Sequence, residues 1–140
     1  MASPSPIVGT WSLVSAVYED AATGERGHPL GLHPRGAQIA TPEGRWIAVV
    51  TADSRPVPAT DTERAAALRS MIAYTGRYRV EGDRIVTKVE AAWNEAWVGT
   101  EQVRIMRIEG DLLHLEGPPQ PHPNLAGRAV RVIITWRREA

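Results

Sequence analysis

The order of long and short connections is the feature that most restricts how this chain can fold. Eight segments alternate apolar and polar residues or are rich in β-branched residues, which is typical of strands. Long connections and tight turns alternate between these segments along the whole chain. In an antiparallel up-and-down arrangement, alternate connections lie at opposite ends, so the long ones all meet at one end. The predicted strands are Val8–Glu19, Gly36–Thr41, Arg45–Thr51, Ala73–Val80, Arg84–Ala92, Thr100–Ile108, Leu112–Glu116 and Arg128–Arg138, and the long connections are residues 20–35, 52–72, 93–99 and 117–127.

These segments predict an all-β fold, an eight-stranded antiparallel up-and-down barrel in which residues 1–140 form a single domain. Tight turns such as Thr41-Pro42-Glu43-Gly44 would form a closed floor. The long loops would form a mouth, and loops on a rigid scaffold are where binding usually resides. A barrel of this size is just wide enough to hold one small ligand.

One short helix is predicted between the third and fourth strands. The segment Arg64–Met71 is rich in Ala, Leu and Arg, which favour helix. Thr60 and Glu63 have the spacing of a capping box, and Asp61 is a rival N-cap residue.

Composition narrows the class of function. Lys plus Arg equals Asp plus Glu at 16 each, so no net charge attracts nucleic acid or an anionic membrane. The absence of cysteine excludes disulfides, Cys-ligated zinc and thiol nucleophiles. His28, His33, His114 and His122 match no metal motif, and we expect neither a metal nor another cofactor. The chain shows no signal peptide and no long apolar run, so a cytoplasmic location is expected, and a homodimer stays open.

The start and end of the chain resemble lipocalins. Gly9-Thr10-Trp11 is similar to the Gly-x-Trp signature of that fold, whose Trp packs at the barrel floor beneath an Arg near the end of the last strand. Arg137 and Arg138 end the last predicted strand, which the topology brings beside Trp11. A cation–π contact of this kind is worth ~0.5–2 kcal/mol.

A longer series of segments resembles the bacterial lipocalin-like domain family. Lipocalin-like barrels serve as carriers, isomerases, cyclases and lyases, so the resemblance implies the fold and leaves the function open. Thr87-Lys88 stands where the family often has a His-His pair, so no role that needs an imidazole there carries over. The matching segments are Ile7–Ser15, Pro29-Leu30-Gly31, Pro34-x-Gly36, Thr41-Pro42-x-Gly44, Ala73–Tyr78, Trp97–Arg104, Glu109-Gly110-Asp111 and Trp136-Arg137-Arg138.

Polar residues on the inward-facing side of the sixth predicted strand are the main candidates for catalysis. Alternation places Gln102 and Arg104 inside the barrel, with Met106 further along the same face. A buried Arg needs a partner, because an unpaired charge in an apolar cavity is costly. That partner is either a carboxylate such as Glu90 or an oxygen of a bound ligand.

Aromatic residues supply further candidates for ligand contact. Tyr74 and Tyr78 are expected to face inward, with Gly76 between them leaving room for a ligand or for a bend. Trp93 and Trp97 lie in a mouth loop and suggest a lid, or a cluster that anchors the loop. The other candidate ligand-binding residues are Ser15, Trp46, Thr87 and Met106, of which Trp46 is also interpreted as a core residue. Ser15 is expected to share a face of the first strand with Trp11, Leu13 and Val17, and Thr87 a face of the fifth strand with Ile85, Val89 and Ala91.

Three functions are compatible with these residues. The first is cofactor-independent cyclisation or isomerisation of a hydrophobic natural-product or polyketide-like intermediate, with Arg104, Tyr74 and Gln102 as catalytic residues. The second is passive binding or carriage of such a small molecule. The third is a structural or interaction module with a filled core. A cavity of roughly 300 Å³ or more, open at the long-loop end, would favour catalysis or binding. A solid interior would favour a structural or interaction module.

Overall fold

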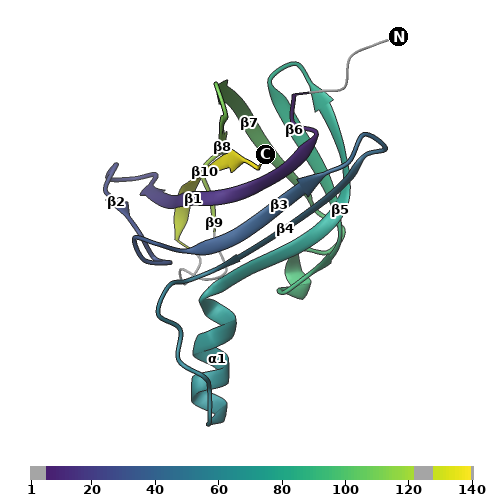
Figure 1. Ribbon diagram of the computed structural model, residues 1–140. Coiled ribbons are helices and arrows are strands. Elements are labelled where there is room, and N and C mark those ends of the chain that lie inside the picture. The colour runs from purple at the N-terminus through teal and green to yellow at the C-terminus, as the bar shows by residue number, and fades with distance from the viewer. Residues whose placement is uncertain (1–5, 122–127, 140) are drawn as a thin grey trace.

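The strands of this protein close into a barrel, as the computed structural model of residues 6–121 and 128–139 shows (Figure 1). Within these residues the sheet has ten strands, and all its pairings are antiparallel. Because β1 pairs with both β3 and β10, the sheet has no long free edge. In chain order the elements are β1 (Gly9–Asp20), β2 (Arg26–Gly27), β3 (Arg35–Ala40), β4 (Arg45–Thr51), α1 (Asp61–Arg69), β5 (Met71–Glu81), β6 (Arg84–Ala92), the 3₁₀ helix η1 (Glu95–Trp97), β7 (Glu101–Glu109), β8 (Leu112–Glu116), β9 (Gln120–Pro121) and β10 (Ala129–Arg138).

The predicted eight-stranded barrel with one short helix is confirmed. The two-residue strands β2 and β9 are additions, which pair with the ends of β1 and β10. Short turns join β3 to β4, β5 to β6 and β7 to β8, and they form the floor. The described parts of the long connections, including α1 and η1, lie at the opposite end and form the mouth (Figure 1). No helix in the described part of the chain is long and apolar enough to cross a membrane.

Helix α1 begins with a capping box. The Glu63 backbone N–H donates to Thr60 Oγ1 at 3.1 Å, and the Thr60 N–H donates to Glu63 Oε1 at 3.0 Å. Thr60 is therefore the N-cap residue, and Asp61 is the first helical residue. No side chain of α1 is buried, and the helix projects from the mouth end of the barrel (Figure 1). The helix ends at Arg69, so the prediction that it reaches Met71 is wrong, because Met71 already pairs with Thr51 in the sheet.

The floor is closed by the predicted Trp and Arg pair. The Arg138 guanidinium lies 4.2 Å from the centre of the Trp11 ring. It also donates to the carbonyl oxygens of Pro6 at 2.6 Å and Val8 at 2.9 Å, while the Trp11 indole N–H donates to the Ile7 carbonyl at 3.0 Å. One arginine thus joins the end of the last strand to the segment that leads into the first.

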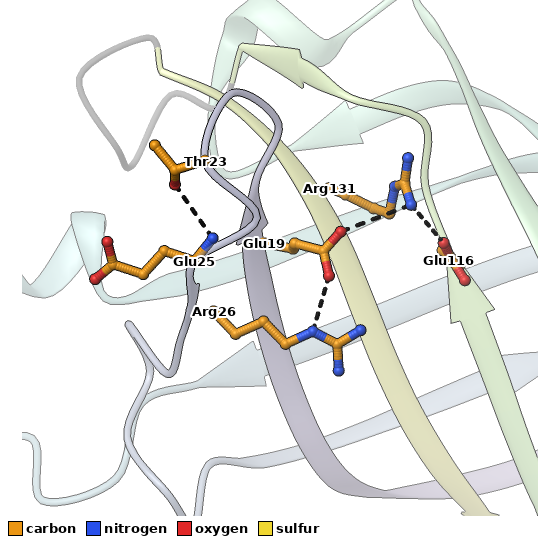
Figure 2. A network of polar contacts seen from close by, with 6 residues as sticks. All are labelled: Glu19, Thr23, Glu25, Arg26, Glu116 and Arg131. Atoms are coloured by element: carbon orange, nitrogen blue, oxygen red, sulfur yellow. Dashed lines mark hydrogen bonds and ion pairs between the residues drawn. The ribbon is translucent and has the colours of Figure 1, made fainter.

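Charged residues lie outside the barrel along the seam where it closes. Arg131 on β10 bridges Glu116 on β8 at 3.2 Å and Glu19 on β1 at 3.7 Å, and Glu19 also pairs with Arg26 on β2 at 2.8 Å (Figure 2). In the following loop, the Glu25 N–H donates to Thr23 Oγ1. Exposed ion pairs contribute little individually, about 1 kcal/mol at most. Their position nevertheless fixes which faces of β1 and β10 point to solvent.

A bulge in β1 changes which residues face inward. Leu13 pairs with Trp136 and Ser15 with Thr135, so Val14 is an extra residue, and its side chain is exposed. Side chains alternate between the two faces of a strand, and one inserted residue shifts this alternation. After the bulge, Ala16 and Tyr18 are buried inside the barrel. The prediction that Ser15 and Val17 face inward with Trp11 and Leu13 is therefore wrong.

A second irregularity lies where β5 pairs with β6. Thr75 pairs with Ala91, and Gly76 pairs with Val89, so Ala92 rather than the predicted Ala91 packs against the core. A Cβ atom at Gly76 would collide with the Lys88 carbonyl oxygen. Gly76 therefore permits a close approach of two backbones at a bend, which is one of its two predicted uses.

Candidate ligand-binding site

A narrow cavity, the central cavity, lies inside the barrel. Four aromatic side chains line it, together with two polar ones, Gln38 and Arg104, and aliphatic residues of β4, β5, β8 and β10. Its volume is about 20 Å³, which is room for one water molecule. That is far below the roughly 300 Å³ expected of a preformed site for a small molecule. The aromatic residues are Trp46, Tyr74, Trp97 and Trp136.

Arg104 lies inside the barrel without a carboxylate partner. Its side chain is 7% exposed, and β7 directs it inward between Gln102 and Met106. Within the described residues, its guanidinium donates to the Val103 carbonyl at 2.8 Å and to Gln102 Oε1 at a long 3.4 Å. A guanidinium has five N–H donors, so its hydrogen-bonding capacity is far from filled. Glu90 pairs with Arg45 outside the barrel at 2.5 Å, so the predicted Arg104–Glu90 pair is wrong.

Gln102 holds the Arg104 side chain and does not itself line the cavity. Gln102 Nε2 donates to Thr100 Oγ1 at 3.0 Å, and Gln120 Nε2 donates to Gln102 Oε1 at 3.3 Å. On the other side, Gly117 packs against the guanidinium, because a Cβ there would lie 3.3 Å from Arg104 Nη1 and Cζ. Hydrogen-bonded side chains therefore hold Arg104 on one side, and the glycine at position 117 leaves room for its guanidinium on the other.

The buried Tyr18 and the half-buried Tyr74 share the interior with Arg104. Burial raises the pKa of Tyr74, while the positive charge of Arg104 and the nearby Trp46 indole N–H oppose that rise. Burial also raises the pKa of Tyr18, again against the opposing charge of Arg104. Both phenols therefore stay protonated at neutral pH.

The sequence profile of the lipocalin-like domain family matches residues 8–139. This chain belongs to the lipocalin-like domain family. A relative from Aspergillus oryzae, the 4′-hydroxy-3′-methoxypropiophenone carrier protein ppsC, is 35% identical over 88 residues, which cover 56% of this chain and 77% of the relative.

At the mouth of this lipocalin-like barrel, an aromatic group covers the central cavity. Trp97 packs edge-on against Tyr74, with ring centres 5.3 Å apart, and against Trp93, with ring centres 4.7 Å apart. Asn94 caps the 3₁₀ helix that carries Trp97, with its Oδ1 accepting from the Ala96 N–H. Trp97 lines the cavity, and Trp93 packs against Trp97 without lining it.

The lipocalin-like barrel places the other predicted site residues away from the cavity wall. Tyr78 donates its hydroxyl to the Thr41 carbonyl at 2.6 Å, which anchors the floor turn. Thr87 is buried and Met106 half-buried, yet neither lines the central cavity. Ser15 lies on the opposite face of β1. His28 and His33 are exposed, and His122 lies outside the described residues.

Among the cavity residues that were not predicted from the sequence, two have polar side-chain atoms, Gln38 and Trp136. Gln38 on β3 is fully buried, and neither its Nε2 nor its Oε1 has a hydrogen-bond partner among the described residues. Trp136 on β10 is also buried, and its indole N–H is likewise unpartnered there. The buried Trp46 N–H completes no hydrogen bond either, although it lies near the Tyr74 hydroxyl. Buried polar groups are nearly always hydrogen-bonded. Unpartnered polar groups on three residues around one cavity therefore need an explanation.

Proposed function

We propose that this lipocalin-like barrel binds an apolar small molecule and holds a carbonyl or anionic oxygen of that molecule at Arg104. The observation that carries the proposal is a buried guanidinium that has no carboxylate partner in the described chain and borders a cavity with aromatic walls. Burying a charge without a counter-charge is costly, whereas a ligand oxygen would complete its hydrogen bonds.

By volume alone, the central cavity favours a filled-core module, but the polar side chains of the interior do not fit one. In such a module the inward positions would be apolar or mutually satisfied. Here Arg104 and Gln38 keep unfilled hydrogen-bonding capacity at the centre of the barrel. A ligand would therefore have to enlarge the cavity, and we propose that it does so by moving Trp97, which lines the cavity and packs edge-on against Tyr74.

The proposed class of ligand rests on the residues that line the central cavity and on the relative from Aspergillus oryzae. Aromatic side chains around a narrow space favour a flat, conjugated molecule. The relative from Aspergillus oryzae is named as a carrier of an aryl ketone, which combines a ring with a carbonyl oxygen. Carriage of a conjugated ketone, such as a natural-product intermediate, is therefore the function that we favour.

The test is a titration with 4′-hydroxy-3′-methoxypropiophenone and with 2-methoxy-4-propylphenol, which has a methylene in place of the carbonyl. Both should quench tryptophan fluorescence, and Arg104→Met should weaken binding of the ketone by about ten- to a hundred-fold, the value of a charge-assisted hydrogen bond. Binding of the methylene analogue should change little. The exposed Arg137→Met is the matched control.

Two results would contradict this function. One is an equal affinity of the wild type and Arg104→Met for the ketone. The other is no binding of either compound to the wild-type protein by calorimetry, which detects binding even where no tryptophan responds.

Catalysis is a second candidate, favoured by the protonated Tyr74 beside Arg104. These groups, with Gln102 positioning Arg104, would polarise a ligand oxygen during a cyclisation or isomerisation. Among the described residues that line the central cavity there is no carboxylate and no imidazole. The barrel would therefore hold a reactive conformer and stabilise an oxyanion, without removing a proton itself.

Exchange of the α-protons of the bound ketone with D₂O distinguishes the two candidates. Hydroxide from the solvent would remove the α-proton, and stabilisation of the resulting enolate by Arg104 and Tyr74 would accelerate this exchange. Arg104→Met and Tyr74→Phe would abolish the acceleration. Exchange at the rate of the free ketone would leave carriage as the function.

A further inference from the structure

Gln38, Trp46 and Trp136, here called the floor group, lie on the floor side of the central cavity. Trp46 is near the start of β4, directly after a floor turn, and Trp136 is near the end of β10, which terminates at the floor. Gln38 pairs with Ala48, one inward position above the Ala40–Trp46 pair. Arg104 and Trp97 border the same cavity from the mouth side. The cavity therefore has polar groups at both ends, and Tyr74 and aliphatic side chains line it between them.

The floor group offers a specific combination of donors and acceptors. Each indole contributes one N–H donor, and the Gln38 amide contributes two N–H donors and an acceptor oxygen. Within the described residues, both polar atoms of Gln38 and the Trp136 N–H have no hydrogen-bond partner, and the Trp46 N–H has only the nearby Tyr74 hydroxyl. A hydroxyl suits this combination, because it accepts from up to two of these N–H groups and donates to Gln38 Oε1. A carboxylate has no proton for Gln38 Oε1, and its charge matches Arg104 at the other end.

We propose that the floor group binds a hydroxyl at the end of the ligand opposite to the oxygen held by Arg104. The ligand is then a flat aromatic molecule with a carbonyl or acidic oxygen at one end and a phenolic or alcoholic hydroxyl at the other. This inference rests on the proposed function, because it assigns the second end of the same ligand.

We therefore expect the Gln38 amide to contribute to ligand binding and not to the stability of the fold. An unsatisfied buried amide destabilises a fold, and its replacement by an apolar side chain of similar shape is neutral or stabilising. Gln102 is the matched contrast, because it is also buried but hydrogen-bonded to Thr100, Arg104 and Gln120. The same substitution to Met should therefore have opposite effects on stability at the two positions.

The experiment compares 4′-hydroxypropiophenone with propiophenone, which lacks only the hydroxyl. The wild type should bind the hydroxylated probe about ten-fold more tightly, and Gln38→Met should remove this preference while it leaves the affinity for propiophenone unchanged. Gln38→Met should raise Tm by about 3 °C, and Gln102→Met should lower it. In ¹⁵N-labelled protein, the hydroxylated probe should shift the indole N–H signals of Trp46 and Trp136 more than propiophenone does.

The outcomes separate this inference from the function on which it rests. If both probes bind the wild type equally well, or if Gln38→Met weakens both equally, the floor group does not recognise a hydroxyl and carriage still stands. A lower Tm for Gln38→Met would mean that its amide has a structural role, for instance through a bound water, and would also overturn the inference. If neither probe binds, the proposed function fails together with it.

Discussion

At the scale of single residues, the interior of the barrel depends on which side chains are left without partners. Arg104 was identified from its alternation with Met106 and Ile108, and its burial is confirmed. Gln38 was not predicted, because apolar residues lie on both faces of β3, Ala37 and Ile39 on one and Ala40 on the other. The alternation therefore did not indicate which face points into the barrel. Tyr18 was missed because the bulge at Val14 inverts the expected face.

Gly117 allows a prediction at this scale. A methyl group there would contact the Arg104 guanidinium at 3.3 Å, closer than ordinary van der Waals distance, so Gly117→Ala should displace the guanidinium. We expect ketone affinity to fall about five-fold, roughly 1 kcal/mol, with little change in Tm. Affinity for 2-methoxy-4-propylphenol should be unchanged, and an equal loss for both compounds in calorimetry would contradict this role of Gly117.

At the scale of elements, the strands and the helix differ in what stabilises them. The strands are held by burial of one face, whereas α1 buries no side chain and depends on its own capping and local bonds. Helix stability without tertiary packing is marginal for a segment of this length. Arg55 ties the C-terminal end of α1 to the preceding loop, because it donates to the Ala67 carbonyl and to Ser70 Oγ, both at 2.9 Å.

Thr60→Ala should therefore act locally. Loss of the cap destabilises the helix by about 1 kcal/mol, since the Glu63 N–H loses its acceptor. Amide exchange across residues 63–67 should accelerate about five-fold, while exchange in the strands and the global Tm stay the same. A global Tm lowered by several degrees would show that α1 packs more strongly than its exposure indicates.

At the scale of the whole molecule, closure of the barrel joins the two ends of the chain. Strand β1 pairs with β10 along most of its length, and Arg138 fastens this seam at the floor. A guanidinium can bind two carbonyls and stack on an indole at once, which an ammonium cannot do with the same geometry.

Arg138→Ala should lower the global stability by about 1–3 kcal/mol, because the hydrogen bonds to Pro6 and Val8 and the contact with Trp11 are lost together. Arg138→Lys should recover only part of it. The neighbouring Arg137→Ala, which removes an exposed side chain near Asp111, should change stability little. Urea denaturation of the three variants measures this, and equal midpoints for Arg138→Ala and Arg137→Ala would contradict the role of the floor pair.

The sequence by itself predicted the barrel, its floor and mouth, a capped helix near Thr60 and the inward position of Arg104, all from local alternation, turn residues and loop length. The contact of Trp11 with an arginine at the end of the last strand was implied by the resemblance to lipocalins, and the structure chose Arg138 over Arg137 and Thr60 over Asp61. Only the tertiary structure decided that Glu90 lies outside, that Gln38, Trp136 and Arg104 line one cavity, and that this cavity is small. Those facts depend on two strand irregularities and on the packing of side chains from distant strands, and no single segment encodes either.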